Sequence, residues 1–95
     1  MAVAFELRFA GATLGQYDEV VRRMGFTPEG PGAQGGLFHW VAQTDDGIRV
    51  VDVWETPQDF ETFAKETMRP MVAQIGITTE PEVNSFPVHN YFTAG

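Results

Sequence analysis

The fold is decided by one stretch of the chain, LFHWVAQTDDGIRVVDVWETPQDF, which runs from Leu37 to Phe60. Its centre, Asp45-Asp46-Gly47, separates two runs rich in aromatic and β-branched residues. Asp-Gly supplies the positive φ angles that a short hairpin turn requires. The stretch therefore predicts two antiparallel strands joined by a tight turn.

The turn allows two registers, and they place His39 on different faces of the hairpin. A two-residue loop at Asp46-Gly47 pairs position 45 with position 48 and brings four side chains to one face: His39, Val41, Asp52 and Trp54. A three-residue loop with a bulge brings Phe38 and Trp40 to that face instead and turns His39 to the other. The sequence leaves both registers open.

The segment before the hairpin predicts one strand and one helix. Apolar and polar residues alternate from Val3 to Phe9, as in a half-buried strand. Thr13 and Gln16 have the spacing of a capping box that opens a helix, and Gly25 stands where a left-handed cap would end it. Residues 25–36, GFTPEGPGAQGG, predict a long irregular connection, which we interpret as a lid.

The segment after the hairpin predicts a second helix and a last strand. Thr56 is placed to cap the helix, and Gly76 is placed to end it. Pro70 lies in the helix interior, where it removes a backbone donor and predicts a kink or break just before it. Residues 82–92 return as a strand, and Pro87 favours an edge position for it.

The order of elements is β-α-β-β-α-β, which predicts an α+β, ferredoxin-like single domain over residues 1–95 with a four-stranded antiparallel sheet. Strand 48–54 is apolar on both faces, with Val50 and Trp54 on one side and Val51 and Val53 on the other. Two helices cover one face of such a sheet. We therefore expect a second copy of the chain to cover the other face, giving a homodimer.

Composition excludes several classes of partner. The chain of 95 residues carries a formal charge of -7, with its six Lys and Arg dispersed, so neither nucleic acid nor an anionic membrane is an expected partner. No apolar run approaches the roughly 20 residues of a membrane span, and no signal peptide is recognisable, so we expect a cytoplasmic protein. The absence of cysteine excludes disulfides and thiolate chemistry.

Three segments together resemble a known family. They are the hairpin GLFHWVAQTDDGIRVVDVWET, the helix start PQDFETF with a later Arg-Pro, and the tail PEVNSFPVHNYF. The chain resembles, over essentially its whole length, the dimeric α+β barrel proteins, and within them small bacterial relatives of the antibiotic biosynthesis monooxygenases. The resemblance implies a dimeric α+β barrel with a pocket in each subunit.

Only some of the pocket residues of this family have a match in the chain. Trp54 matches a Trp that lines the pocket of the cofactor-independent quinol and anthrone oxygenases. Those oxygenases have an Asn and a Tyr where this chain has Val50 and Phe60. The haem-degrading branch holds haem with a Trp and a His, and the matching positions here are Phe63 and Ala73. The resemblance therefore implies no haem ligation of that type, and we expect no cofactor.

Three ionisable residues are the candidate catalytic groups. Asp52 is flanked by Val51 and Val53, so if it is buried its carboxylate needs a partner such as Arg8 or His39. His39 and His89 are either hydrogen-bonded core residues or bases that transfer protons if they face one cavity with Asp52. No pair of ligands at helical spacing supports a metal site, and none is predicted.

The predicted function is that of a small-molecule-binding protein with an apolar pocket between helices and sheet. The candidate catalytic residues are His39, Asp52 and His89, and the candidate substrate-binding residues are Trp54, Phe60, Phe63, Trp40 and Tyr91. Trp54 is also consistent with simple core packing. The enzyme hypothesis is a cofactor-independent oxygenase acting on an aromatic or hydrophobic molecule. The alternatives are a proton-transfer enzyme, such as an isomerase or cyclase, and a non-catalytic ligand-binding or stress-associated dimer.

Overall fold

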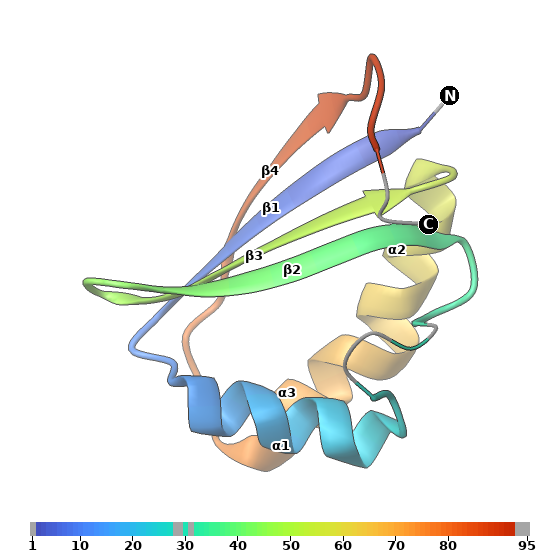
Figure 1. Cartoon of the computed structure of the whole chain (residues 1–95). Helices are drawn as coiled ribbons and strands as arrows, with labels where there is room; N and C mark the ends of the chain where they lie inside the picture. The colour runs from blue at the N-terminus through green and yellow to red at the C-terminus, as the bar shows by residue number, and fades with distance from the viewer. Residues whose placement is uncertain (1, 28–29, 31, 93–95) are drawn as a thin grey trace.

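The computed structural model describes residues 2–27, 30 and 32–92. The elements follow the expected order along the chain: β1 (Val3–Ala10), α1 (Leu14–Met24), β2 (Gly36–Thr44), β3 (Gly47–Trp54), α2 (Pro57–Phe63), the π-helical turn η1 (Ala64–Met68), α3 (Arg69–Ile75) and β4 (Glu82–Pro87). The strands form one antiparallel sheet in the order β2-β3-β1-β4, and the helices lie on one side of it (Figure 1). The predicted α+β, ferredoxin-like fold is confirmed.

The core lies between the sheet and the helices. Alternate residues of β1, namely Phe5, Leu7 and Phe9, point into it, and their partners on β3 share that face because residues paired in an antiparallel ladder point to the same side. Leu7 is only 1% exposed. The helices contribute Phe60 and Ala64. The predicted alternation of β1 is therefore confirmed.

The hairpin has the faces of the two-residue alternative, with His39 on the side of Asp52 and Trp54, and the bulged alternative is wrong. The loop is Asp45-Asp46, because Thr44 pairs with Gly47, so the pairing is shifted by two residues from that of an Asp46-Gly47 loop. A shift of two preserves which side chains share a face. The neighbouring strand β1 leaves no room for a side chain at Gly47, where a Cβ atom would lie 2.0 Å from the carbonyl oxygen of Phe9. Gly47 is used for close strand contact and not for the turn.

The helix termini follow the predicted capping. Thr13 and Gln16 form the complete capping box of α1, and Gly25 ends that helix with φ 82°. Thr56 caps α2 by accepting a hydrogen bond from the backbone of Asp59. Gly76 ends α3 with φ 96°.

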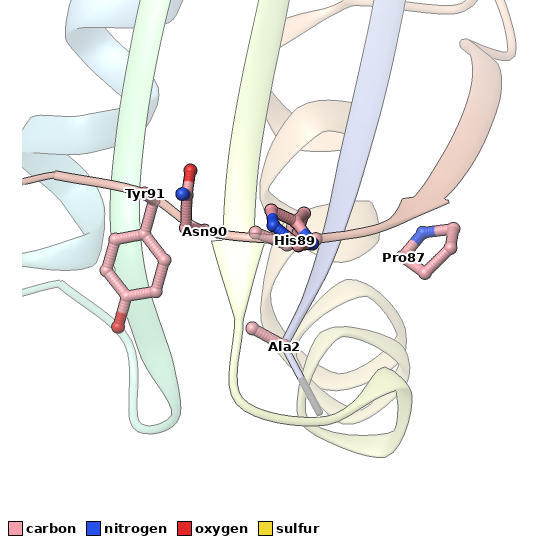
Figure 2. Close-up of a pocket in the computed structure, with 6 residues that line it drawn as sticks. Ala2, Pro87, His89, Asn90 and Tyr91 are labelled. Atoms are coloured by element: carbon pink, nitrogen blue, oxygen red, sulfur yellow. The ribbon is translucent and has the colours of Figure 1, made fainter.

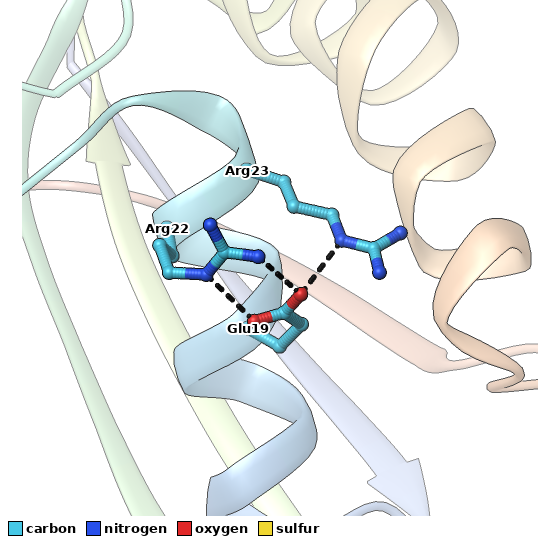
Figure 3. A network of polar contacts seen from close by, with 3 residues as sticks. All are labelled: Glu19, Arg22 and Arg23. Atoms are coloured by element: carbon cyan, nitrogen blue, oxygen red, sulfur yellow. Dashed lines mark hydrogen bonds and ion pairs between the residues drawn. The ribbon is translucent and has the colours of Figure 1, made fainter.

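Three charged side chains of α1 form a surface network (Figure 3). The carboxylate of Glu19 accepts hydrogen bonds from Arg22 and Arg23. These bonds lower the pKa of Glu19 to about 2. The two arginines also lie in the last turn of the helix, where positive charge is favourable.

Pro70 interrupts the α-helical ladder but not the helix. The five residues before α3 form a π turn, in which the backbone N–H of Arg69 bonds to the carbonyl of Ala64, five residues earlier. A π turn takes up one extra residue and changes the hydrogen-bond spacing at that point. The predicted irregularity just before Pro70 is confirmed, although the chain remains helical to Ile75.

The last strand is shorter than expected. Strand β4 is at the edge of the sheet, as Pro87 indicated, but it ends at that residue, and the prediction of a strand to Phe92 is wrong. Because proline has no N–H, the ladder loses a donor at Pro87. Beyond it, Val88 donates a backbone hydrogen bond to Ala2, and residues 89–92 leave the sheet.

The connection between α1 and β2 is irregular where it is described. Ala33 packs against the core, and the carbonyl of Gly35 accepts a hydrogen bond from the backbone of Glu55 at 2.9 Å. The lid interpretation falls in part on residues 28, 29 and 31, which lie outside the described residues. In the described part of the chain, no helix has the length and apolar character needed to cross a membrane.

Truncating the centre of the core should destabilise the fold strongly. We expect Leu7→Ala to lower the free energy of unfolding by about 3 kcal/mol, because it removes a fully buried side chain and leaves a cavity. Val83, which pairs with Leu7 but is 46% exposed, is the matched control, and Val83→Ala should cost much less. Urea unfolding of both variants measures the difference. Equal losses would contradict the assigned core.

Candidate functional site

Three side chains from three elements form a hydrogen-bonded chain on the helix side of the sheet. Asp52 lies on β3, His39 lies opposite it on β2, and Tyr17 lies on α1. The Nδ1 atom of His39 bonds to Oδ1 of Asp52, and its Nε2 atom lies 2.5 Å from the Tyr17 hydroxyl oxygen. The register of the hairpin creates this chain, because it pairs His39 directly with Asp52.

The protonation of each group follows from its partner. Asp52 is 6% exposed, and a buried carboxylate is stabilised by a donor, so His39 donates from Nδ1. In a neutral imidazole this leaves Nε2 as the acceptor, and the Tyr17 hydroxyl donates to it. Asp52 thus fixes both the tautomer and the orientation of His39. The sequence offered Arg8 or His39 as the partner of Asp52, and the structure selects His39, since Arg8 is on the other face beside Glu6.

Tyr17 holds its proton firmly. Burial raises the pKa of its hydroxyl, and the negative charges of Asp52 and Asp18 raise the pKa further. A protonated Tyr17 is consistent with its role as the donor to His39. The side chain of His39, in the middle of this chain of hydrogen bonds, is 47% exposed, and both of its ring nitrogens are hydrogen-bonded.

An aromatic cluster lies on the same face as the hydrogen-bonded chain. Trp54 is two residues beyond Asp52 on β3, and its ring lies against Phe60 and Phe63, with centroid separations of 6.0 and 5.4 Å. Phe60 also stacks on Phe5 at 3.9 Å. The indole N–H of Trp54 is buried and has no hydrogen-bond partner within the described ranges. Trp54, Phe60 and Phe63 therefore meet as expected, but these rings fill the space between them.

The remaining predicted residues lie on the other side of the sheet. Trp40 pairs with Val51 and points away from the helices, and it is 40% exposed. The segment carrying His89 and Tyr91 crosses the strands on that side, where it lines an open hollow of about 630 Å³ (Figure 2). The hypothesis that both histidines face one cavity with Asp52 is therefore wrong. The sheet separates His89, Trp40 and Tyr91 from His39.

A second hollow, of about 320 Å³, lies between α3 and the start of β4, with Phe9, Val72 and Ile77 in its wall. Neither hollow includes His39, Asp52 or Trp54. The accessible position for a ligand near the hydrogen-bonded chain is therefore the solvent-open side of His39. Among the residues that the structure describes, no three His, Asp or Glu side chains are grouped to hold a metal ion.

Sequence reasoning missed Tyr17 as a functional residue. Its spacing with Val20, Val21 and Met24 is that of an apolar stripe along α1, which predicts a core residue, and it does pack against the core. The signal that could have found it is the hydroxyl itself, because a buried Tyr usually directs its O–H toward a partner. The face of α1 that carries Tyr17 packs on the sheet beside His39.

Comparisons with known proteins identify the fold. No protein-family model matches the chain, and no curated protein matches it. A solved structure of a candidate antibiotic biosynthesis monooxygenase from Chloroflexus aurantiacus J-10-fl is similar, with a TM-score of 0.64 at 19% identity over 97% of this chain and 98% of that one. SnoaB, a cofactor-independent oxygenase from Streptomyces nogalater, has a TM-score of 0.63 at 19% identity over 95% of both chains.

The chain has the fold of the antibiotic biosynthesis monooxygenases. A third similar structure is MhuD, a heme-degrader from Mycobacterium tuberculosis, with a TM-score of 0.51 at 16% identity over 98% of this chain and 100% of that one. The antibiotic biosynthesis monooxygenase fold therefore includes proteins of different chemistry. The residues of this chain's own site carry the functional inference.

The raised pKa of Tyr17 has a measurable consequence. We expect the hydroxyl to ionise above its ordinary value of 10.0, and Asp52→Asn to lower its pKa by removing one of the two negative charges. The difference in tyrosinate absorbance between the wild type and Tyr17→Phe, followed against pH, isolates this transition. Because the folded-state pKa is the higher one, the unfolded chain releases the proton first, and the free energy of unfolding falls as pH rises above the unfolded-state pKa. Ionisation at or below the ordinary value would contradict the geometry.

Proposed function

We propose that the protein is a small-molecule-binding homodimer and a cofactor-independent, monooxygenase-like enzyme that acts on an aromatic or hydrophobic substrate, with His39 as its general base. The observation that carries the proposal is the hydrogen-bonded chain from Asp52 through His39 to Tyr17. A base that is oriented by a buried carboxylate and has a partly exposed imidazole side chain is suited to proton abstraction.

The proposed chemistry begins with removal of a proton from an electron-rich substrate. His39 takes the proton on the Nε2 side, and the Asp52 carboxylate stabilises the imidazolium that forms. The resulting carbanion reacts with oxygen. For an anthrone, one molecule of oxygen converts the methylene group to a carbonyl, one oxygen atom enters the product, and the other leaves as water with the two hydrogens. The substrate supplies all the electrons.

Two observations support a reaction of this class. SnoaB, which has this fold, is described as a cofactor-independent oxygenase. By counting along the chain, the resemblance matches the haem-binding residues of the haem-degrading branch to Phe63 and Ala73, whose side chains have no atom that ligates iron. The proposal therefore assigns no haem or other cofactor to this chain.

Two other functions have specific support. A proton-transfer enzyme, such as an isomerase or cyclase, needs only the oriented base, and Val50 and Phe60 replace the Asn and Tyr of the oxygenases. A non-catalytic ligand-binding or stress-associated dimer is favoured by the rings of Phe60 and Phe63, which occupy the space against Trp54. Localisation to the cytoplasm stays a prediction of the sequence.

The face of the sheet opposite the helices, which the segment with His89 and Tyr91 crosses, still exposes apolar side chains that support the homodimer. One half of this face is apolar, with side chains that pair across the strands: Ala4, Phe38, Trp40, Val51, Val53 and Phe86. Phe38, Trp40 and Phe86 are 42%, 40% and 54% exposed. The other half is polar, where Glu6 contacts Arg49 at 3.3 Å and Asn84 at 3.4 Å. Exposed apolar side chains gathered on one face are typical of an interface between proteins.

Solution mass tests the dimer. We expect light scattering to give twice the 10.5 kDa of one chain, and Trp40→Glu to shift the protein toward the monomer because it would bury a charge in the interface. Leu14, on α1, is 38% exposed and is the matched control, and Leu14→Glu should leave the mass unchanged. A monomeric wild type at micromolar concentration would refute the dimer.

Oxygen uptake with anthrone or a quinol tests the base. We expect His39→Ala to lower the rate by roughly a hundredfold or more, because a positioned base contributes about that much. His89→Ala, which changes the histidine on the other side of the sheet, should retain the rate. An unchanged rate in His39→Ala would eliminate His39 as the base, and a loss in both variants would return His89 to the site. Binding of the substrate without oxygen uptake would favour the non-catalytic alternative.

A further inference from the structure

The basic nitrogen of His39 is not free to meet a substrate. Its Nδ1 atom donates to Asp52, and its Nε2 atom accepts the hydroxyl of Tyr17 at 2.5 Å. The two rings are also nearly parallel, with an interplanar angle of 10° and centroids 5.9 Å apart. A substrate therefore reaches His39 either by displacing Tyr17 or by acting through it.

The Tyr17 oxygen retains acceptor capacity. A phenolic oxygen can accept a hydrogen bond while its own O–H donates to another group. A substrate hydroxyl that donates to this oxygen would complete a line of hydrogen bonds from the substrate through Tyr17 and His39 to Asp52. Transfer along this line requires no lasting charge on Tyr17, because the oxygen gains one proton as it loses another.

We propose that Tyr17 is the catalytic residue that meets the substrate, and that the substrate is an uncharged hydroxylated aromatic molecule. The substrate O–H bond breaks and a new O–H bond forms at Tyr17, while the proton of Tyr17 passes to Nε2 of His39. The products are a substrate anion and an imidazolium held by Asp52. This inference rests on the proposed function, since it assigns the contact through which His39 acts as base.

The charges around the site select an uncharged ligand. The Asp52 carboxylate is buried behind His39, and Asp18 follows Tyr17 in α1. The described polar contacts of His39 bring no Lys or Arg to this site. A carboxylate or phosphate on the ligand would therefore meet negative charge without a positive partner, whereas a neutral hydroxyl only needs the acceptor that Tyr17 supplies.

Binding of three probes tests the contact between the substrate hydroxyl and the Tyr17 oxygen, and it requires no turnover. We expect the wild type to bind β-naphthol more tightly than naphthalene, which lacks the hydroxyl, and more tightly than β-naphthoate, which is charged. Tyr17→Phe keeps the ring and removes the acceptor, so it should raise the Kd of β-naphthol by about tenfold and leave that of naphthalene unchanged. Fluorescence titration measures each Kd, and circular dichroism checks the fold of the variant.

Equal binding of β-naphthol and naphthalene by the wild type would overturn the inference without any substitution. A preference that survives Tyr17→Phe would overturn it as well. The rate of oxygen uptake with a quinol, whose hydroxyl can donate to Tyr17, distinguishes a proton relay through Tyr17 from a Tyr17 that only blocks His39. A relay predicts a rate about a hundredfold lower in Tyr17→Phe, whereas blocking predicts an unchanged or higher rate. A lower rate of oxygen uptake in His39→Ala with an unchanged rate in Tyr17→Phe would overturn the relay through Tyr17 but not the role of His39 as base. No loss in His39→Ala would refute the proposed function itself.

Discussion

A carboxylate is buried in the centre of the sheet, and it needs a hydrogen-bond donor beside it. Asp52 occupies an interior position of β3 where every alternate neighbour is apolar, and a charge there is costly without a partner. His39 is that partner, and the hairpin register alone places it opposite. In this register Gly47 pairs with Thr44, and β1 approaches Gly47 too closely for any side chain. The chemistry of the site is thus linked to a packing requirement between two strands.

Most elements of the fold are predictable from local sequence patterns. Capping residues such as Thr13 and Thr56 mark helix starts through local hydrogen bonds, so they are readable without tertiary information. The register was harder, because Asp45-Asp46-Gly47 allows several loops and the choice depends on β1, which is distant in sequence. The end of β4 was missed because Pro87 is compatible with an edge strand and also with its termination.

Some residues of the candidate site are predictable from the sequence and others are not. Asp52 and His39 are polar residues among apolar neighbours, so the sequence predicts that each needs a hydrogen-bond partner. In the structure they bond to each other. His89, Trp40 and Tyr91 were grouped with them only because the course of the chain after Pro87 could not be derived from local pattern. Tyr17 was assigned to the core because helical spacing reports the direction of a side chain and not what its terminal atom contacts.

The π turn at Ala64–Met68 alters how this chain lines up with any relative whose second helix is regular. One extra residue is wound into that turn, so every position after Met68 is displaced by one relative to an uninterrupted helix. Against such a relative, the structurally equivalent residue would be Gln74 where counting along the chain indicates Ala73. Equivalences in α3 with such a relative therefore require a one-residue gap, placed within Ala64–Met68.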